Sequence, residues 1–116
     1  MSGKLLQEPS FLILTALASG PKHGYGIVSD VAAISDGRVH LRAGTLYAAL
    51  DRLCSEGWVE PDSEEVVDGR LRRYYRLTSQ GASRLDTEVA RMRSHVQVAE
   101  ARLRARTPVE LAGGSA

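Results

Sequence analysis

Arginines gather in two short stretches of the chain, where several side chains could act on one ligand. The first stretch holds Arg38 and Arg42, and the second holds Arg70, Arg72, Arg73 and Arg76. A guanidinium group presents several N–H donors to phosphate oxygens, so each stretch is a candidate phosphate-binding patch. The alternative is that these arginines pair with the acidic residues that lie between them, which are Glu60, Asp62, Glu64, Glu65 and Asp68.

No other residues form a constellation that suggests catalysis or metal binding. His23, His40 and His95 have no metal-ligand spacing with one another or with Cys54. Paired carboxylates, a nucleophile elbow, a phosphate loop and an HExxH motif are all missing from the sequence. We therefore predict no enzyme, no cofactor and no metal site. Cys54 is expected to be a small buried hydrophobic residue, with a redox switch as the lesser alternative.

Composition indicates an ordinary globular protein of modest size. The chain has 116 residues, of which 43% are hydrophobic and 25% charged, with a formal net charge of +1. That charge is lower than is usual for a nucleic-acid-binding domain, but a local patch can bind phosphate on a nearly neutral chain. Because Cys54 is alone and neither a membrane span nor a signal peptide is recognisable, we expect a cytoplasmic protein.

Three helices are predicted in the first half of the chain. Pro9 can begin a helix that is apolar almost all round, and Gly20-Pro21 ends it. A second helix is predicted over residues 24–34 and a third over 44–56, with Leu46, Leu50 and Leu53 on its inner face. Two helices joined by a short connection are typical of a helix-turn-helix.

A β-hairpin and a long helix are predicted in the second half. Residues 71–77 alternate as a strand does, and Asp68-Gly69 favours a tight turn before them, which gives a two-stranded wing. Thr78 can cap a fourth helix that runs to about Arg106. The prediction is an α+β, mostly α fold: a winged helix-turn-helix domain at 8–78, a C-terminal dimerisation helix at 79–107 and a disordered tail at 108–116.

The fourth helix carries a narrow apolar seam in which the steps between residues alternate between four and three. This spacing is typical of a helix that packs against a copy of itself. Its members are Leu85, Val89, Met92, Val96, Ala99 and Leu103. We expect a homodimer in which Phe11 and Leu12 of the first helix support this seam.

An ordered set of short motifs resembles the PadR family of transcriptional regulators. Gly24-Tyr25-Gly26-Ile27 and Gly44-Thr45-Leu46-Tyr47 are similar to the starts of the second and recognition helices in that family. The resemblance continues through Leu50-Asp51-Arg52-Leu53, Glu56-Gly57, Gly69-Arg70, Tyr74-Tyr75-Arg76-Leu77-Thr78 and Gly81. The single C-terminal helix resembles the short-tailed members, which dimerise through it. The sequence departs from the family pattern at two places that could change which DNA bases are recognised. Ala48 stands where many relatives have a proline, and Arg42-Ala43 stands where many have small or turn-forming residues.

The resemblance and the helix periodicity together imply a DNA-binding surface. Its expected members are Tyr25, Arg42, Ala43, Thr45, Tyr47, Ala48, Arg70 and Arg72. Residues on the outer face of the recognition helix would contact base edges, and the wing arginines would contact phosphates or the minor groove. In the alternative, Thr45 only caps the helix, Tyr47 only packs and Tyr25 is an ordinary exposed residue. Arg70 and Arg72 are expected to point outward, whereas Arg73 shares a face with Tyr75.

The resemblance implies a nucleoid-associated repressor that binds a pseudo-palindromic operator as a homodimer. It also implies a small aromatic or phenolic effector that binds near the dimer interface and releases the DNA, with Phe11, Met92 and Val96 as candidate lining residues or ordinary core. An alternative from another class is a winged helix used only for protein–protein contact. Trp58 is expected to be core beneath the wing.

Overall fold

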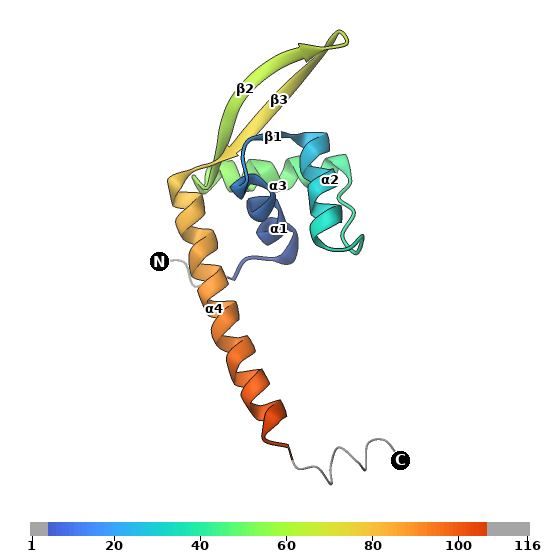
Figure 1. Ribbon diagram of the computed structural model, residues 1–116. Coiled ribbons are helices and arrows are strands. Elements are labelled where there is room, and N and C mark those ends of the chain that lie inside the picture. Colours follow the sequence, from blue (N-terminus) through green and yellow to red (C-terminus); the bar gives the residue numbers. More distant parts are fainter. Residues whose placement is uncertain (1–4, 107–116) are drawn as a thin grey trace. The chain divides into compact units, whose positions relative to one another are not determined.

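The computed structural model describes residues 5–106 and confirms the mostly helical α+β architecture (Figure 1). The chain divides between Asp86 and Thr87, inside the last helix, into two compact units. The elements follow in the order α1 (Glu8–Ala18), β1 (Lys22–His23), α2 (Gly24–Ile34), α3 (Ala43–Ser55), β2 (Val59–Val67), β3 (Arg70–Leu77) and α4 (Ser79–Arg104).

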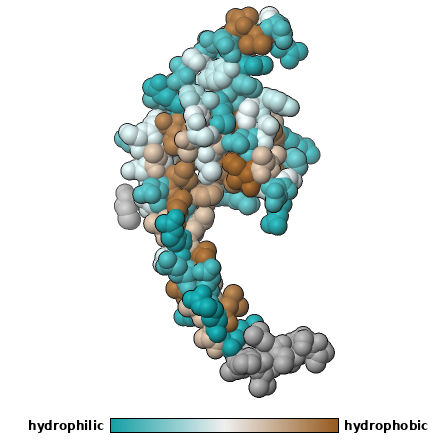
Figure 2. Space-filling view, in the orientation of Figure 1, coloured by the Kyte–Doolittle hydropathy of each residue, from teal (hydrophilic) through white to brown (hydrophobic). Residues whose placement is uncertain are grey.

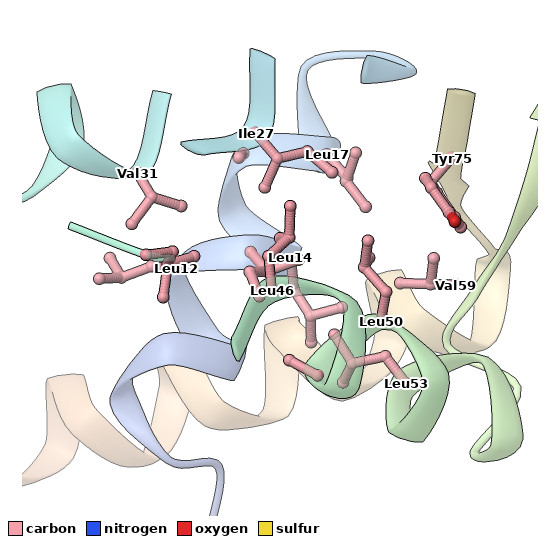
Figure 3. Packing of buried hydrophobic residues seen from close by; sticks show 14 residues of the cluster. Leu12, Leu14, Leu17, Ile27, Val31, Leu46, Leu50, Leu53, Val59 and Tyr75 are labelled. Atoms are coloured by element: carbon pink, nitrogen blue, oxygen red, sulfur yellow. The ribbon is translucent and has the colours of Figure 1, made fainter. Parts of the chain in front are cut away.

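The core of the first unit lies between α1, α2 and α3 (Figure 3). Helix α1 is buried on several sides, as its nearly continuous apolar sequence predicts, and Ile13 and Leu14 are completely inaccessible to solvent. Helix α3 contributes Leu46, Leu50 and Leu53 from the single face that its periodicity predicts. Burying each such side chain stabilises the fold by about 1.5–3 kcal/mol, so this cluster fixes how α3 lies on its neighbours.

The sheet has three antiparallel strands among the described residues, in the order β1-β3-β2. Strands β2 and β3 form the predicted hairpin, called the wing below, and Asp68 and Gly69 at its turn both have positive φ, at 53° and 77°. Two such residues make the turn that matches the twist of a hairpin. Strand β1 was not predicted: Lys22 and His23 pair with the far edge of β3.

A close junction joins the base of the wing to the start of α4. Thr78 Oγ1 donates to Gly57 O at 2.6 Å and accepts the Gly81 N–H at 2.9 Å, which confirms Thr78 as the helix cap. Gly57 ends α3 with a φ of +81°, and the Trp58 N–H donates back to Leu53 O. Gly81 lies so close to Trp58 O that an added Cβ would overlap it.

The predicted domain boundary and the division of the structure into two units fall at different places along α4. The predicted boundary at 78/79 lies at the start of α4, and the two units divide further along that helix. Both predicted domain limits therefore stay predictions, and the predicted disordered tail at 108–116 lies outside the described residues. Within residues 5–106, the helices are too short or too polar to cross a bilayer.

Candidate nucleic-acid interface

The outer face of α3 is solvent-exposed along its first two turns. All five residues expected there lie on it with exposed side chains, and they are Arg42, Ala43, Thr45, Tyr47 and Ala48. The helix begins at Ala43, and its N-cap residue, Arg42, makes no side-chain capping bond. The first N–H groups of α3 are therefore available to an external acceptor such as a phosphate oxygen.

Thr45 is exposed and does not occupy the capping position. The alternative in which Thr45 only caps the helix thus finds no support in this geometry. Its hydroxyl can donate to and accept from a base edge or a phosphate. That role in DNA binding stays a prediction.

Tyr47 combines packing with exposure. Its ring lies against Gly24 at the start of α2, where an added Cβ would overlap the Tyr47 hydroxyl and come within 3.1 Å of Cζ. The side chain is nevertheless 47% exposed. Gly24 therefore lets Tyr47 lie between the two helices of the helix-turn-helix while one edge of its ring faces solvent.

The start of α2 is fixed by a residue whose role the sequence did not reveal. His23 is the N-cap of α2, and its Nδ1 accepts the Gly26 N–H at 3.3 Å. Its ring also packs edge-on against Tyr74 of β3, with centroids 5.3 Å apart. His23 thus links the wing to α2, and the next side chain that projects from this corner is Tyr25, which is 78% exposed.

A cleft of about 550 Å³ separates the starts of α2 and α3 from the wing. Tyr25 and Tyr47 border it on the helical side. The wing side is formed by Val67, Asp68, Arg70, Leu71, Arg72 and Arg73. Predicted residues from three separate segments of the sequence therefore meet around one concave surface.

The wing arginines divide into paired and unpaired groups. Arg73 binds Glu64 across the hairpin at 3.2 Å, and Arg76 binds Glu60 at 2.7 Å and Asp62 at 3.1 Å. The acidic residues of β2 thus neutralise these two arginines, as the alternative interpretation of the charge pattern proposes. The Arg70 side chain is exposed and has no ion-pair or hydrogen-bond partner among residues 5–106.

Arg72 and Arg73 differ in exposure from what strand alternation predicts. Arg72 is half-buried and lies beside the Tyr74 hydroxyl, whereas Arg73 is exposed although it shares a face with Tyr75. The hairpin extends beyond the helical core, so the face that buries Tyr75 near the base faces solvent at Arg73. Tyr74 donates to Glu65 at 2.5 Å, and this hydrogen bond raises the pKa of the tyrosine above its ordinary value.

The predicted dimer residues are distributed between the core and the surface. Leu12 is only 6% exposed and belongs to the core of the first unit, whereas Phe11 is half-buried. On α4, Val96 and Leu103 are 52% and 60% exposed. The seam continues through Leu85, Val89, Met92 and Ala99, whereas Val98, also exposed and apolar, projects from the opposite side of the helix.

Cys54 and Trp58, which the sequence analysis considered separately from the DNA-binding surface, pack within the first unit. Cys54 is half-buried, and burial, assisted by the nearby Asp51 carboxylate, raises the pKa of its thiol. Trp58 packs against the core as predicted, and the Arg84 guanidinium lies 5.4 Å from its ring centroid. Across residues 5–106, no three His, Cys, Asp or Glu side chains are grouped as metal ligands.

Comparison with known proteins identifies relatives over most of the first unit. The model of the PadR-like family of transcriptional regulators matches residues 13–87. An uncharacterised protein of Lysinibacillus sphaericus is 31% identical over 74 residues, which make up 64% of this chain and 68% of that protein. A protein in a transposon of Streptomyces fradiae is 39% identical over 73% of this chain, but the match spans only 23% of that longer protein.

Solved structures have the same fold. A PadR family transcription regulator of Clostridium difficile superposes with a TM-score of 0.69 at 28% identity, over 84% of this chain and 99% of that one. Bacillus subtilis PadR, solved in complex with operator DNA, gives a TM-score of 0.64 at 22% identity over 72% of this chain and 48% of that one, a likeness of fold alone. Since the family model covers well over half of its residues, the chain belongs to the PadR-like family of transcriptional regulators.

Proposed function

We propose that this protein is a sequence-specific repressor that binds operator DNA through α3, the start of α2 and the wing. One observation carries the proposal: Tyr47, from the exposed face of α3, and the unpaired Arg70 of the wing border the same cleft. A recognition helix enters the major groove by its N-terminal turn, which is where Arg42, Ala43 and Thr45 lie.

In this arrangement the cleft would hold one strand of the DNA backbone. The phosphate backbone of a duplex separates its major groove from the adjacent minor groove. If α3 lies in the major groove, the backbone strand occupies the cleft and the wing lies over the minor groove. Tyr25 and Arg70 then contact that backbone from its two sides.

The test is selection of binding sites from random duplex DNA, followed by titration of the recovered duplex at several salt concentrations. We expect binding that survives excess competitor DNA and weakens steeply between about 50 and 200 mM salt, because neutralised phosphates release counterions. If the chain recovers no preferred sequence and binds all duplexes alike, specific recognition is refuted. The winged helix would then serve a protein partner instead.

Variants separate base reading from phosphate contact. Thr45→Ala should weaken operator binding by about 1–3 kcal/mol and relax sequence preference. Arg70→Gln should weaken binding to all sequences and reduce the magnitude of the salt slope by about 0.9 for each arginine removed. Arg52→Gln is the matched control, because Arg52 is exposed at the far end of α3 and does not border the cleft.

We also propose that the protein acts as a homodimer through the apolar seam of α4, which presents two recognition helices to a pseudo-palindromic operator. The support is the exposure of Val96 and Leu103, which in a lone chain would face water. Met92→Glu combined with Val96→Glu should produce a monomer in light-scattering chromatography and abolish tight operator binding. A double variant that remains dimeric refutes the seam as the interface.

Repression, action at the chromosome in the cytoplasm, and release by a small aromatic or phenolic effector complete the proposal. The cytoplasmic location rests on the lone Cys54, and the other parts rest on the family resemblance. A reporter gene placed downstream of the recovered operator should be silenced by the protein, and activation would refute repression. Titration of simple phenolic acids into the protein–operator complex tests release, and an unchanged complex refutes this class of effector.

A further inference from the structure

The far end of the wing carries two apolar side chains that the fold does not bury. Val66 is 70% exposed and Leu71 is 60% exposed, and neither belongs to the core or packs against it. Figure 2 shows this apolar spot as an isolated brown area among hydrophilic residues at the end of the hairpin. Threonine would support a strand equally well at both positions, so local folding does not explain them.

The register places the two side chains together. Val66 and Leu71 are directly opposite each other, one pair inward from the turn at Asp68-Gly69. In a hairpin with a two-residue turn this pair lacks direct hydrogen bonds, and the side chains of such a pair approach most closely. The tip therefore presents a single apolar wedge made from one residue of each strand, which we name the tip pair.

Charge determines which partner suits the tip pair. Arg70 adjoins Leu71, and its side chain has no ion-pair or hydrogen-bond partner among the described residues. Among the acidic side chains near the tip, Glu64 is paired with Arg73 and Glu65 accepts a hydrogen bond from Tyr74, while Asp68 in the turn is exposed. An apolar wedge beside an unpaired guanidinium matches a nucleic-acid groove, which has phosphates at its rim and apolar base and sugar surfaces within.

We propose that the tip pair inserts against the base pairs of the operator's minor groove and deforms the duplex there. This inference rests on the proposed function, which brings the wing to the minor groove. An undistorted minor groove is about 6 Å wide, and two strands with their side chains need more room than that. Insertion therefore requires a widened groove and a bend, which flexible pyrimidine–purine steps permit most readily.

The experiment uses the full-length protein and the duplex recovered by site selection. A 2-aminopurine placed at successive steps of the flanking minor groove reports unstacking as a rise in fluorescence, and end-to-end energy transfer reports bending. Val66→Thr combined with Leu71→Thr removes apolar surface and keeps strand-forming residues. Ile34→Thr is the control, because it makes the same kind of change at an exposed apolar side chain at the end of α2, which does not border the cleft.

The wild-type protein and I34T should raise fluorescence at one step and bend the duplex. The double variant should lose both signals and bind the selected duplex about tenfold more weakly, with its salt slope unchanged. If the wild-type protein binds the selected duplex but the double variant binds and bends it equally, the tip pair has no role in the groove. This inference is then refuted, while the proposed function stands.

Two further outcomes are distinct. If the wild-type protein selects no sequence, the proposed function fails and this inference fails with it. If the double variant binds and bends DNA normally but no longer represses a reporter gene, the tip pair contacts a protein, and the inference is again overturned.

Discussion

Replacing Gly81 with alanine should destabilise the protein, although alanine is the better helix former. Gly81 lies in the first turn of α4, and an added Cβ would overlap Trp58 O and lie 2.8 Å from Leu77 Cδ1. Trp58 O is a backbone atom, so only a shift of the backbone can relieve that overlap, whereas the Leu77 methyl is the end of a side chain at the base of the wing. Helix α4 and the wing would have to separate by about an ångström, which is large for a close-packed interior.

The cost follows from the bonds that such a shift strains. Thr78 Oγ1 bonds to Gly57 O, the Gly81 N–H bonds to Thr78 Oγ1, and the Thr78 N–H donates to Trp58 O at 3.0 Å. Each bond contributes about 1 kcal/mol, so their loss outweighs the gain in helix propensity of about 1 kcal/mol. We expect G81A to lower the free energy of unfolding by about 2–4 kcal/mol.

Urea denaturation followed by circular dichroism measures this change, at one fixed protein concentration because the stability of the proposed dimer would depend on concentration. Gly44→Ala is the matched control in the first turn of α3, where an added Cβ meets nothing within 4 Å. G44A should leave stability unchanged or raise it by up to about 1 kcal/mol. A G81A protein as stable as the wild type would refute the close junction between α4 and Trp58.

Two further predictions concern Tyr47 and Cys54. Gly24→Ala should displace the Tyr47 ring and weaken operator binding. Tyr47→Phe should partly rescue G24A, because it removes the hydroxyl that the new Cβ would overlap. A double variant that binds no better than G24A would contradict this packing of Tyr47 on Gly24. Cys54 should react with iodoacetamide at mildly alkaline pH more slowly than the same thiol in urea, because burial and then Asp51 raise its pKa and leave less thiolate. Asp51→Asn should speed that reaction, and an unchanged rate would exclude the carboxylate's influence.

Sequence alone predicted the elements whose side chains follow a period. Leu46, Leu50 and Leu53 recur with the helix turn, and burial of that face determines how α3 lies. The same period places Thr45 and Tyr47 outside the core, so the candidate reading face was visible before the structure. The predicted span of 44–56 differs from the observed Ala43–Ser55 by one residue at each end.

Features that depend on partners distant in sequence were not predictable. Strand β1 has only Lys22 and His23, too few to show alternation, and it forms because β3 offers a free edge. Alternation along β3 correctly placed Arg73 on the face of Tyr75, but exposure depends on where the helical core ends beneath the hairpin. Alternation likewise could not show that Val66 and Leu71 would lie beyond the helical core and remain exposed.

Three glycines of the family motif show how the interface is supported. Gly24 makes room for Tyr47, and Gly81 makes room for Trp58, so both have a reason within the chain. Gly44 has none, because a Cβ there meets open space and alanine would favour the helix. Glycine at the exposed start of the recognition helix is explained if a DNA backbone approaches α3 closely at this point. The variant G44A should therefore be at least as stable as the wild type and yet bind the operator more weakly. Unchanged binding by G44A would instead place the phosphate strand away from the start of α3.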